Sequence, residues 1–197
     1  MKSYPYILII GSVIGLVASF VLTIETLNLA KNPQAELTCD INVFLSCGSV
    51  IETWQGYVFG FPNPILGIVS FSMLIAVGIM QLFGGRANKI FWLLVNLGIF
   101  LSLIFVIWFI YQSFLVIGAL CIYCLVTWIV TWPLFLYTTV WNYRENHFKF
   151  EKIKVRWQNK IDAILKNISS NHIHYFIGWY FVIAFLIGLK LREYLSF

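Results

Sequence analysis

Residues Ile90–Tyr111 read IFWLLVNLGIFLSLIFVIWFIY and contain no Asp, Glu, Lys or Arg. About 20 helical residues cross the hydrocarbon core of a bilayer, so this stretch predicts a transmembrane helix. Four other stretches have the same character, in a chain that is 60% hydrophobic and 11% charged. The sequence therefore predicts an all-α integral membrane protein whose first apolar stretch is a retained helix rather than a signal peptide. The expected spans are Tyr6–Leu29, Pro64–Phe83, Ile90–Tyr111, Ala119–Tyr137 and Ile173–Leu191.

Basic residues are distributed unevenly between the two sides of the predicted membrane. If the N-terminus is cytoplasmic, the outer side keeps only Lys31, Lys190 and Arg192 of the 13 Lys and Arg residues. Because cytoplasmic loops are enriched in Lys and Arg, we expect this orientation in the cell (inner) membrane. The net charge of +5 then reflects topology and anionic lipid headgroups, and gives no reason to invoke nucleic acid.

Two connections between the predicted spans are long. We expect a bundle over residues 1–143 with an extracytoplasmic loop over 30–63, a basic cytoplasmic connection over 144–172, and a fifth transmembrane helix over 173–197. Apolar and aromatic residues between 49 and 59 predict a short helix at the lipid surface. In the basic connection, apolar residues at helical spacing predict an amphipathic helix that lies in the membrane interface. These residues are Ile153, Trp157, Ile161, Ile164, Leu165 and Ile168.

Four cysteines form two pairs, both on the predicted extracytoplasmic side. Cys39 and Cys47 lie in the outer loop, and Cys121 and Cys124 form a C-x-x-C motif at the start of the fourth span. The free N–H groups and positive dipole end of a helix N-terminus stabilise a thiolate, the reactive form of cysteine. The pattern predicts a device that carries electrons from a water-exposed dithiol to an acceptor dissolved in lipid.

Two other interpretations use the same cysteines. Four thiolates can bind zinc, but structural zinc usually lies in a small soluble fold, and an oxidising compartment disfavours permanent thiolates. We therefore expect no metal. Two structural disulfides are the second alternative, but they leave unexplained why one pair lies at the membrane boundary. The short spacer between Cys39 and Cys47 closes at little entropic cost, so we expect this disulfide to exchange easily.

Three kinds of polar residue besides the cysteines are candidates for the site. Asn63 lies between two prolines where the second span enters the membrane. It acts either as a helix cap or as a hydrogen-bond donor to a carbonyl of a ring-shaped ligand. Glu25 is expected to extend its charge toward the outer interface. The histidines are expected at the surface, far from the thiols: His147, His172 and His174.

The residues together resemble the vitamin K epoxide reductase family, and most of all its bacterial members. The resemblance covers about residues 5–143. It rests on Cys39-Asp40 followed by Cys47, on FGFPNPILG at residues 59–67, and on Cys121-Ile122-Tyr123-Cys124. The family implies a four-helix bundle around a quinone, with a fifth helix outside it.

The resemblance also implies a role for each site residue. Cys124 faces the quinone, which is ubiquinone or menaquinone, and Asn63 hydrogen-bonds to it. Cys47 attacks Cys121, and Cys39 exchanges with an extracytoplasmic thioredoxin-fold (DsbA-like) protein. A separate partner is implied because the chain lacks the fused thioredoxin-like domain that some bacterial members carry.

The sequence therefore predicts a DsbB-like, quinone-dependent thiol oxidase that supports disulfide-bond formation. Trp128 is expected in the quinone site, four residues after Cys124. Vertebrate enzymes have a substrate-facing tyrosine there, so a vertebrate-type vitamin K epoxide or quinone reductase is the weaker alternative. A non-enzymatic membrane scaffold with structural disulfides is the other alternative. The near absence of intramembrane charge argues against ion transport.

Overall fold

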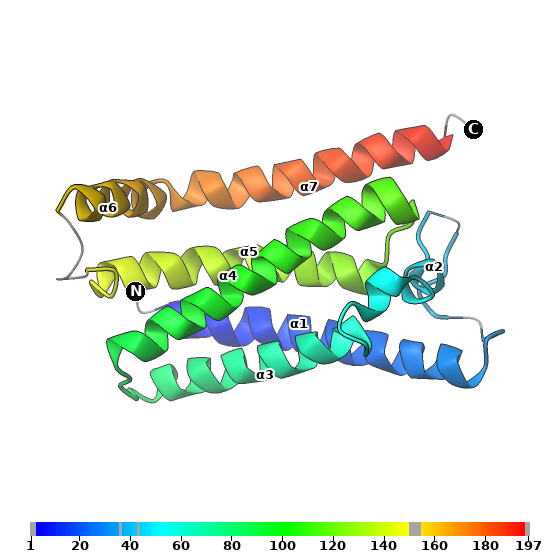
Figure 1. Ribbon diagram of the computed structural model, residues 1–197, viewed down its shortest axis with the longest axis horizontal. Coiled ribbons are helices and arrows are strands. Elements are labelled where there is room, and N and C mark those ends of the chain that lie inside the picture. The colour runs from blue at the N-terminus through cyan, green and yellow to red at the C-terminus, as the bar shows by residue number, and fades with distance from the viewer. Residues whose placement is uncertain (1–2, 36, 43, 150–154, 196–197) are drawn as a thin grey trace.

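The computed structural model describes residues 3–35, 37–42, 44–149 and 155–195, and every named element within them is helical (Figure 1). Five of the helices are long and apolar enough to cross a membrane, which confirms the predicted fold class. They are α1 (Tyr4–Lys31), α3 (Asn63–Leu82), α4 (Lys89–Tyr111), α5 (Ile122–Arg144) and α7 (His172–Leu195).

Four shorter elements connect the long helices: α2 (Cys47–Ile51), η1 (Trp54–Tyr57), η2 (Gln112–Ile117) and α6 (Val155–Ser170). The basic amphipathic helix is confirmed as α6, although its predicted start at Ile153 lies outside the described residues. The predicted single helix between residues 49 and 59 is wrong, because Thr53 has an extended backbone and divides the segment into α2 and η1. Val50 and Ile51 of α2 are also buried rather than at a lipid surface.

Helix α1 is the centre of the bundle, since it packs against α3 on one side and α5 on another. Small residues allow α1 and α3 to approach closely: a Cβ atom on Gly67 would collide with Ser19, and one on Gly15 would collide with Phe71. Helix α4 packs against α5. Helix α7 lies outside the other four and contacts α5, where the rings of Trp132 and Trp179 stack at 5.0 Å.

The buried core consists of two clusters. One contains Tyr4, Trp92 and Trp141, whose rings pack with centroids 4.1 to 6.3 Å apart. The other contains all four cysteines, together with residues of the outer loop. In Figure 1, α2 and the C-terminus lie at one end of the bundle, and α6 lies at the opposite end. All four cysteines therefore lie at the end of the bundle where α2 is found.

The fourth long helix differs from its prediction, because it begins at Ile122 rather than Ala119 and continues to Arg144. Gly118 directly follows η2 and has a φ of 78°, a left-handed conformation that favours glycine. Its N–H donates to the carbonyl of Ser113 near the start of η2. The chain therefore turns before α5, and Ala119–Cys121 becomes a short non-helical connection that is free to pair with another segment.

Candidate redox site

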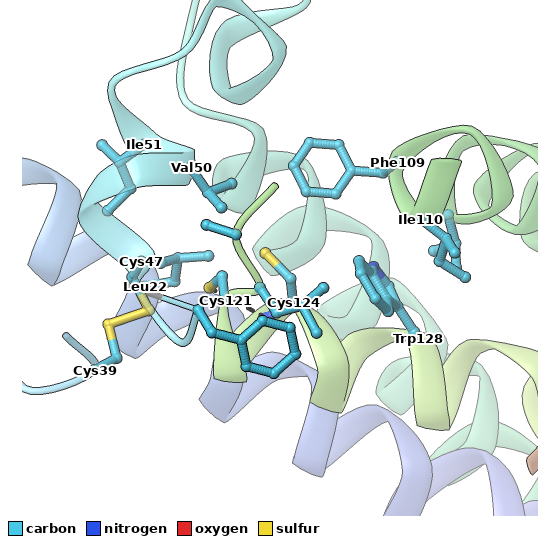
Figure 2. Close-up of a cluster of buried hydrophobic side chains, with 14 of the residues drawn as sticks. Leu22, Cys39, Cys47, Val50, Ile51, Phe109, Ile110, Cys121, Cys124 and Trp128 are labelled. Atoms are coloured by element: carbon cyan, nitrogen blue, oxygen red, sulfur yellow. Dashed lines mark hydrogen bonds between the residues drawn. A yellow bond between two sulfur atoms is a disulfide. The ribbon is translucent and has the colours of Figure 1, made fainter. Parts of the chain in front are cut away.

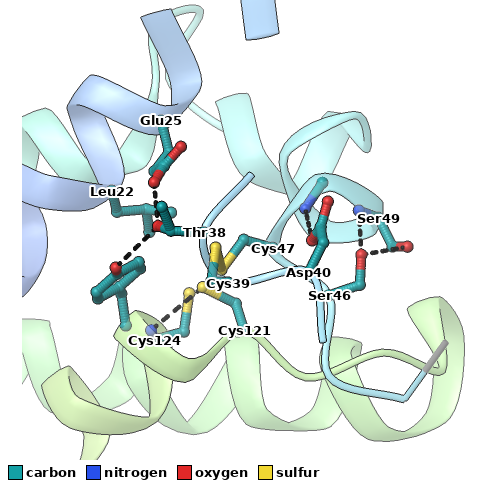
Figure 3. The surroundings of a disulfide bond; sticks show 12 residues. Leu22, Glu25, Thr38, Cys39, Asp40, Ser46, Cys47, Ser49, Cys121 and Cys124 are labelled. Atoms are coloured by element: carbon teal, nitrogen blue, oxygen red, sulfur yellow. Dashed lines mark hydrogen bonds between the residues drawn. A yellow bond between two sulfur atoms is a disulfide. The ribbon is translucent and has the colours of Figure 1, made fainter. Parts of the chain in front are cut away.

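Cys39 and Cys47 form a disulfide, with their Cα atoms 5.7 Å apart. Cys47 is the first residue of α2, whose exposed N–H groups are satisfied by two side chains. Ser46 Oγ accepts from Ser49 N at 3.1 Å, and Asp40 Oδ1 accepts from Gly48 N at 3.0 Å (Figure 3). Asp40 directly follows Cys39, and Cys47 begins α2. The bond between Asp40 and Gly48 therefore connects the two ends of the disulfide loop.

The outer disulfide is not water-exposed, contrary to the expectation from the sequence. Cys39 is 2% exposed and Cys47 is 0% exposed. The segment from Leu37 to Ile51 folds back over the end of the helix bundle, where Leu37, Phe44 and Val50 join the buried cluster. The sequence predicts a water-exposed pair of cysteines in this loop, but these apolar residues are enough to bury the disulfide.

Cys121 and Cys124 are free thiols at the start of α5 (Figure 2). Cys121 is the N-cap residue, and its Sγ accepts from the backbone N of Cys124 at 3.4 Å. A hydrogen bond to sulfur and the positive end of a helix both favour the thiolate. Cys121 is 1% exposed and Cys124 is 9% exposed. The predicted placement of this pair at a helix N-terminus is confirmed.

A short backbone bridge joins the two cysteine segments. Leu45 and Leu120 form an isolated parallel bridge. In it, Leu120 N donates to Phe44 O at 2.8 Å and Ser46 N donates to Leu120 O at 3.1 Å. Parallel strands run side by side, and each strand here is followed closely by a cysteine, Cys47 in one and Cys121 in the other. The bridge therefore brings the outer disulfide beside the C-x-x-C turn, as Figures 2 and 3 show.

Asn63 makes two hydrogen bonds that the sequence did not reveal. Its Nδ2 donates to Gln55 O at 2.6 Å, and its Oδ1 accepts from Val58 N at 3.2 Å. The side chain does not cap α3. It instead binds the backbone of η1 at Gln55 and the backbone of Val58 directly after η1. An amide carries a second N–H donor, and Asn63 also lines the cavity described next.

A cavity of about 330 Å³ lies among α1, α3, α4 and α5 next to the inner cysteine pair. Its walls are mostly apolar, and Cys121, Cys124, Asn63 and Trp128 are among the residues that line it. Trp128 is 1% exposed and lies one turn beyond Cys124 on α5 (Figure 2). An apolar cavity with a few polar groups is the usual form of a site for a small organic molecule. A thiol and a flat ring from α5 and an amide from α3 among the lining residues fit a quinone headgroup.

Glu25 is not exposed at the interface, so the expectation for this residue is wrong. It is 7% exposed, and its carboxyl group accepts a hydrogen bond from the hydroxyl of Thr38 (Figure 3). His147 is also only partly exposed, because its Nδ1 lies 2.8 Å from Asn142 Oδ1 and its ring stacks on Trp92. Burial lowers the pKa of His147. This histidine belongs to the aromatic cluster rather than to the cysteine cluster.

The fold has five helices long and apolar enough to cross a membrane, and its site brings two pairs of cysteines together beside an apolar cavity. A sequence model described as the Vitamin K epoxide reductase family matches residues 6–139. The match covers more than half of the chain, and the protein belongs to this family. No curated protein matches the chain. Family membership makes the protein a membrane oxidoreductase that acts on thiols or quinones.

Proposed function

We propose that the protein is a thiol oxidase of the bacterial type, which passes electrons from an extracytoplasmic thioredoxin-fold partner to a membrane quinone. The observation that carries the proposal is the Leu45–Leu120 bridge, which brings a buried disulfide beside a second pair of thiols. Cys124 of that second pair lines an apolar cavity. A disulfide that served stability alone would need neither the second pair nor the cavity.

Electrons move between the pairs by thiol–disulfide exchange. When the inner pair is oxidised and the outer pair reduced, the Cys47 thiolate attacks Cys121 Sγ. A Cys47–Cys121 bond forms, and Cys124 leaves as a thiolate. The Cys39 thiolate then attacks Cys47 Sγ, restores the Cys39–Cys47 disulfide and releases Cys121 as a thiolate. Each attacking thiol loses one proton and each leaving thiolate takes one up. The structure has the pairs as this exchange leaves them, with the disulfide outside and two thiols inside.

A quinone in the cavity would take the two electrons and two protons that turn the inner pair into a disulfide. Cys124 borders the cavity, and Asn63 supplies an amide N–H for a carbonyl oxygen. The helices α3 and α4, which both line the cavity, diverge toward the cysteine end of the bundle (Figure 1). Trp128 has no hydroxyl group, so vitamin K epoxide is not the proposed substrate.

The proposed topology is a cytoplasmic N-terminus with both cysteine pairs on the extracytoplasmic side of the cell membrane. Gln34 in the outer loop and Asn159 on α6 are both exposed and allow a direct test. We expect Gln34→Cys to react with a membrane-impermeant maleimide in intact cells, and Asn159→Cys to react only after lysis. The reverse pattern would place the thiols in a reducing compartment and contradict the proposed direction of electron flow.

The function is tested with purified protein, a reduced thioredoxin-fold oxidant, and ubiquinone or menaquinone, by following quinone absorbance. We expect quinone reduction that depends on both the protein and the reduced partner. The matched control, Cys39→Ser/Cys47→Ser, keeps the inner pair but cannot receive electrons through the loop, so it should be inactive. Failure of the unaltered protein with both quinones, or equal activity in the control, would contradict the proposal.

A further inference from the structure

Glu25 is a buried carboxyl group that the proposed electron pathway does not use. It lies in the last third of α1, at the cysteine end of the bundle, and its Oε1 accepts from Thr38 Oγ1 (Figure 3). Glu25 is buried and Thr38 is exposed, so loss of this contact would cost the buried carboxyl group a hydrogen bond, which is unfavourable. Glu25 therefore anchors the outer loop to the fixed part of the bundle.

The same hydroxyl reaches the C-x-x-C turn. Thr38 Oγ1 lies 3.5 Å from Tyr123 Oη. A threonine hydroxyl has one hydrogen, and in this structure it is donated to Glu25, so Tyr123 is the donor in the second contact. The result is a directed chain from Tyr123 through Thr38 to Glu25. The contact between Thr38 and Tyr123 is long for a hydrogen bond between two hydroxyl groups, so Glu25 is the main anchor of Thr38.

This chain holds the end of the outer disulfide that the backbone bridge does not hold. Thr38 directly precedes Cys39, whereas Leu45 of the Leu45–Leu120 bridge lies two residues before Cys47. Tyr123 lies between Cys121 and Cys124. Both cysteines of the disulfide are therefore fastened to the segment that carries the inner pair, one by backbone hydrogen bonds and the other by side chains.

The disulfide is buried while the loop is held in this way. Cys39 and Cys47 are 2% and 0% exposed, so a soluble partner cannot form a mixed disulfide with either sulfur atom in this conformation. The loop has to open for exchange with the partner and has to close for exchange with Cys121. Any bond that exists only in the closed conformation shifts this equilibrium toward the closed state.

We propose that Glu25 is a positioning residue that, through Thr38, latches the outer disulfide in the closed conformation beside the C-x-x-C turn. The inference rests on the proposed thiol-oxidase function. The latch favours electron transfer between the two pairs and limits access to the disulfide from water. The chemistry requires only an oxygen that accepts a hydrogen bond, so an amide at this position should serve as well as a carboxyl group.

The first readout is the rate at which a water-soluble phosphine reduces the Cys39–Cys47 disulfide in purified, detergent-solubilised protein. Glu25→Leu and Thr38→Val should each accelerate reduction by about tenfold, because both remove the latch bond. Glu25→Gln should retain the slow rate, since its side-chain oxygen accepts the same bond. Thr23→Val is the matched control: it removes a threonine hydroxyl on α1 that donates to Ser19 O and does not contact the loop. It should leave the rate unchanged.

The second readout is the rate at which the outer disulfide re-forms when quinone is added to fully reduced protein. This rate should fall by about tenfold in Glu25→Leu and Thr38→Val and should be normal in Glu25→Gln. The double variant Glu25→Leu/Thr38→Val should be no worse than either single variant, because both act on one bond. The helical circular-dichroism signal of every variant should match that of the unaltered protein, which separates loss of the latch from unfolding.

Three results would overturn the latch: unchanged phosphine reduction in Glu25→Leu, a Glu25→Gln variant as defective as Glu25→Leu, or additive effects in the double variant. The second of these would indicate that Glu25 acts through its charge or its proton. If the unaltered protein fails to re-form the disulfide with quinone, the proposed function fails instead. The phosphine experiment needs no quinone and still decides whether Glu25 holds the loop.

Discussion

The two cysteine pairs lie in one buried cluster but are built on different supports. The inner pair lies at the start of α5, where the backbone of Cys124 is fixed by the helix and its N–H donates to Sγ of the N-cap residue, Cys121. The outer pair lies on a loop that is held by a short backbone bridge, by side-chain hydrogen bonds and by buried apolar residues such as Phe44 and Val50. The inner pair is therefore positioned by a long helix, whereas the position of the outer pair depends on contacts between a loop and the bundle.

This difference matches what a relay between water and lipid requires. The pair that meets a lipid-soluble acceptor has to stay beside the cavity, and the helix N-terminus holds it there. The pair that meets a protein partner has to reach the surface, and loop segments with few buried contacts are the parts of a protein that open most readily. In the proposed relay, the outer pair would therefore serve the protein partner and the inner pair the quinone.

The largest expected effect is on the fixed pair. Cys124→Ala should abolish quinone reduction, since Cys121 then has no partner with which to form the inner disulfide. Alanine is favourable inside a helix, so the bundle should remain folded. Exchange between the outer pair and its partner, measured separately in the same variant, is the internal control and should be retained. Near-normal quinone turnover would show that Cys124 does not belong to the pathway.

A smaller effect is expected from the amide at the cavity. A donor aimed at a carbonyl that gains electron density stabilises the transition state more than the ground state. Loss of such a donor costs about 10²–10³ in rate in enclosed sites, and we expect a smaller loss of about tenfold for Asn63→Leu because this cavity is partly open. The measurement is the rate of each half-reaction: quinone reduction should fall, and exchange with the partner should not.

The contacts of Asn63 within the loop require a matched control. Gln112→Leu removes the neighbouring bond from Gln55 Nε2 to Gln112 Oε1, 3.3 Å long, without removing the amide that lines the cavity. It should keep normal quinone reduction. If Gln112→Leu and Asn63→Leu slow quinone reduction equally, or if Asn63→Leu impairs both half-reactions, Asn63 acts by shaping η1 and not by binding the quinone.

The parts of the fold that follow from local pattern were predictable from the sequence. Five apolar stretches gave the five long helices, and the basic amphipathic pattern gave α6, because hydrophobic periodicity reports directly on helices. The placement of Cys121 and Cys124 at a helix start was predictable for the same reason. Sequence position marked Asn63 and the family resemblance marked Trp128, and both line the cavity.

The parts of the site that depend on contacts between distant segments were not predictable. The Leu45–Leu120 bridge involves too few residues to leave an alternating pattern, and a glycine turn at Gly118 creates the segment that it uses. Glu25 looked like an interfacial charge because its partner, Thr38, lies in a different segment. The burial of the outer disulfide follows from these same long-range contacts, and for that reason it too was missed.

The central claim is that electrons pass from the outer to the inner cysteine pair through a transient Cys47–Cys121 disulfide. Cys39→Ala removes the thiol that resolves this bond, so the bond should accumulate when the inner pair is oxidised by quinone. The measurement is mass spectrometry of alkylated, digested Cys39→Ala protein after quinone addition. The account predicts a peptide pair joined through Cys47 and Cys121, with Cys124 alkylated. A Cys47–Cys124 linkage, or a Cys47 that stays free while Cys121 and Cys124 are joined, would contradict it.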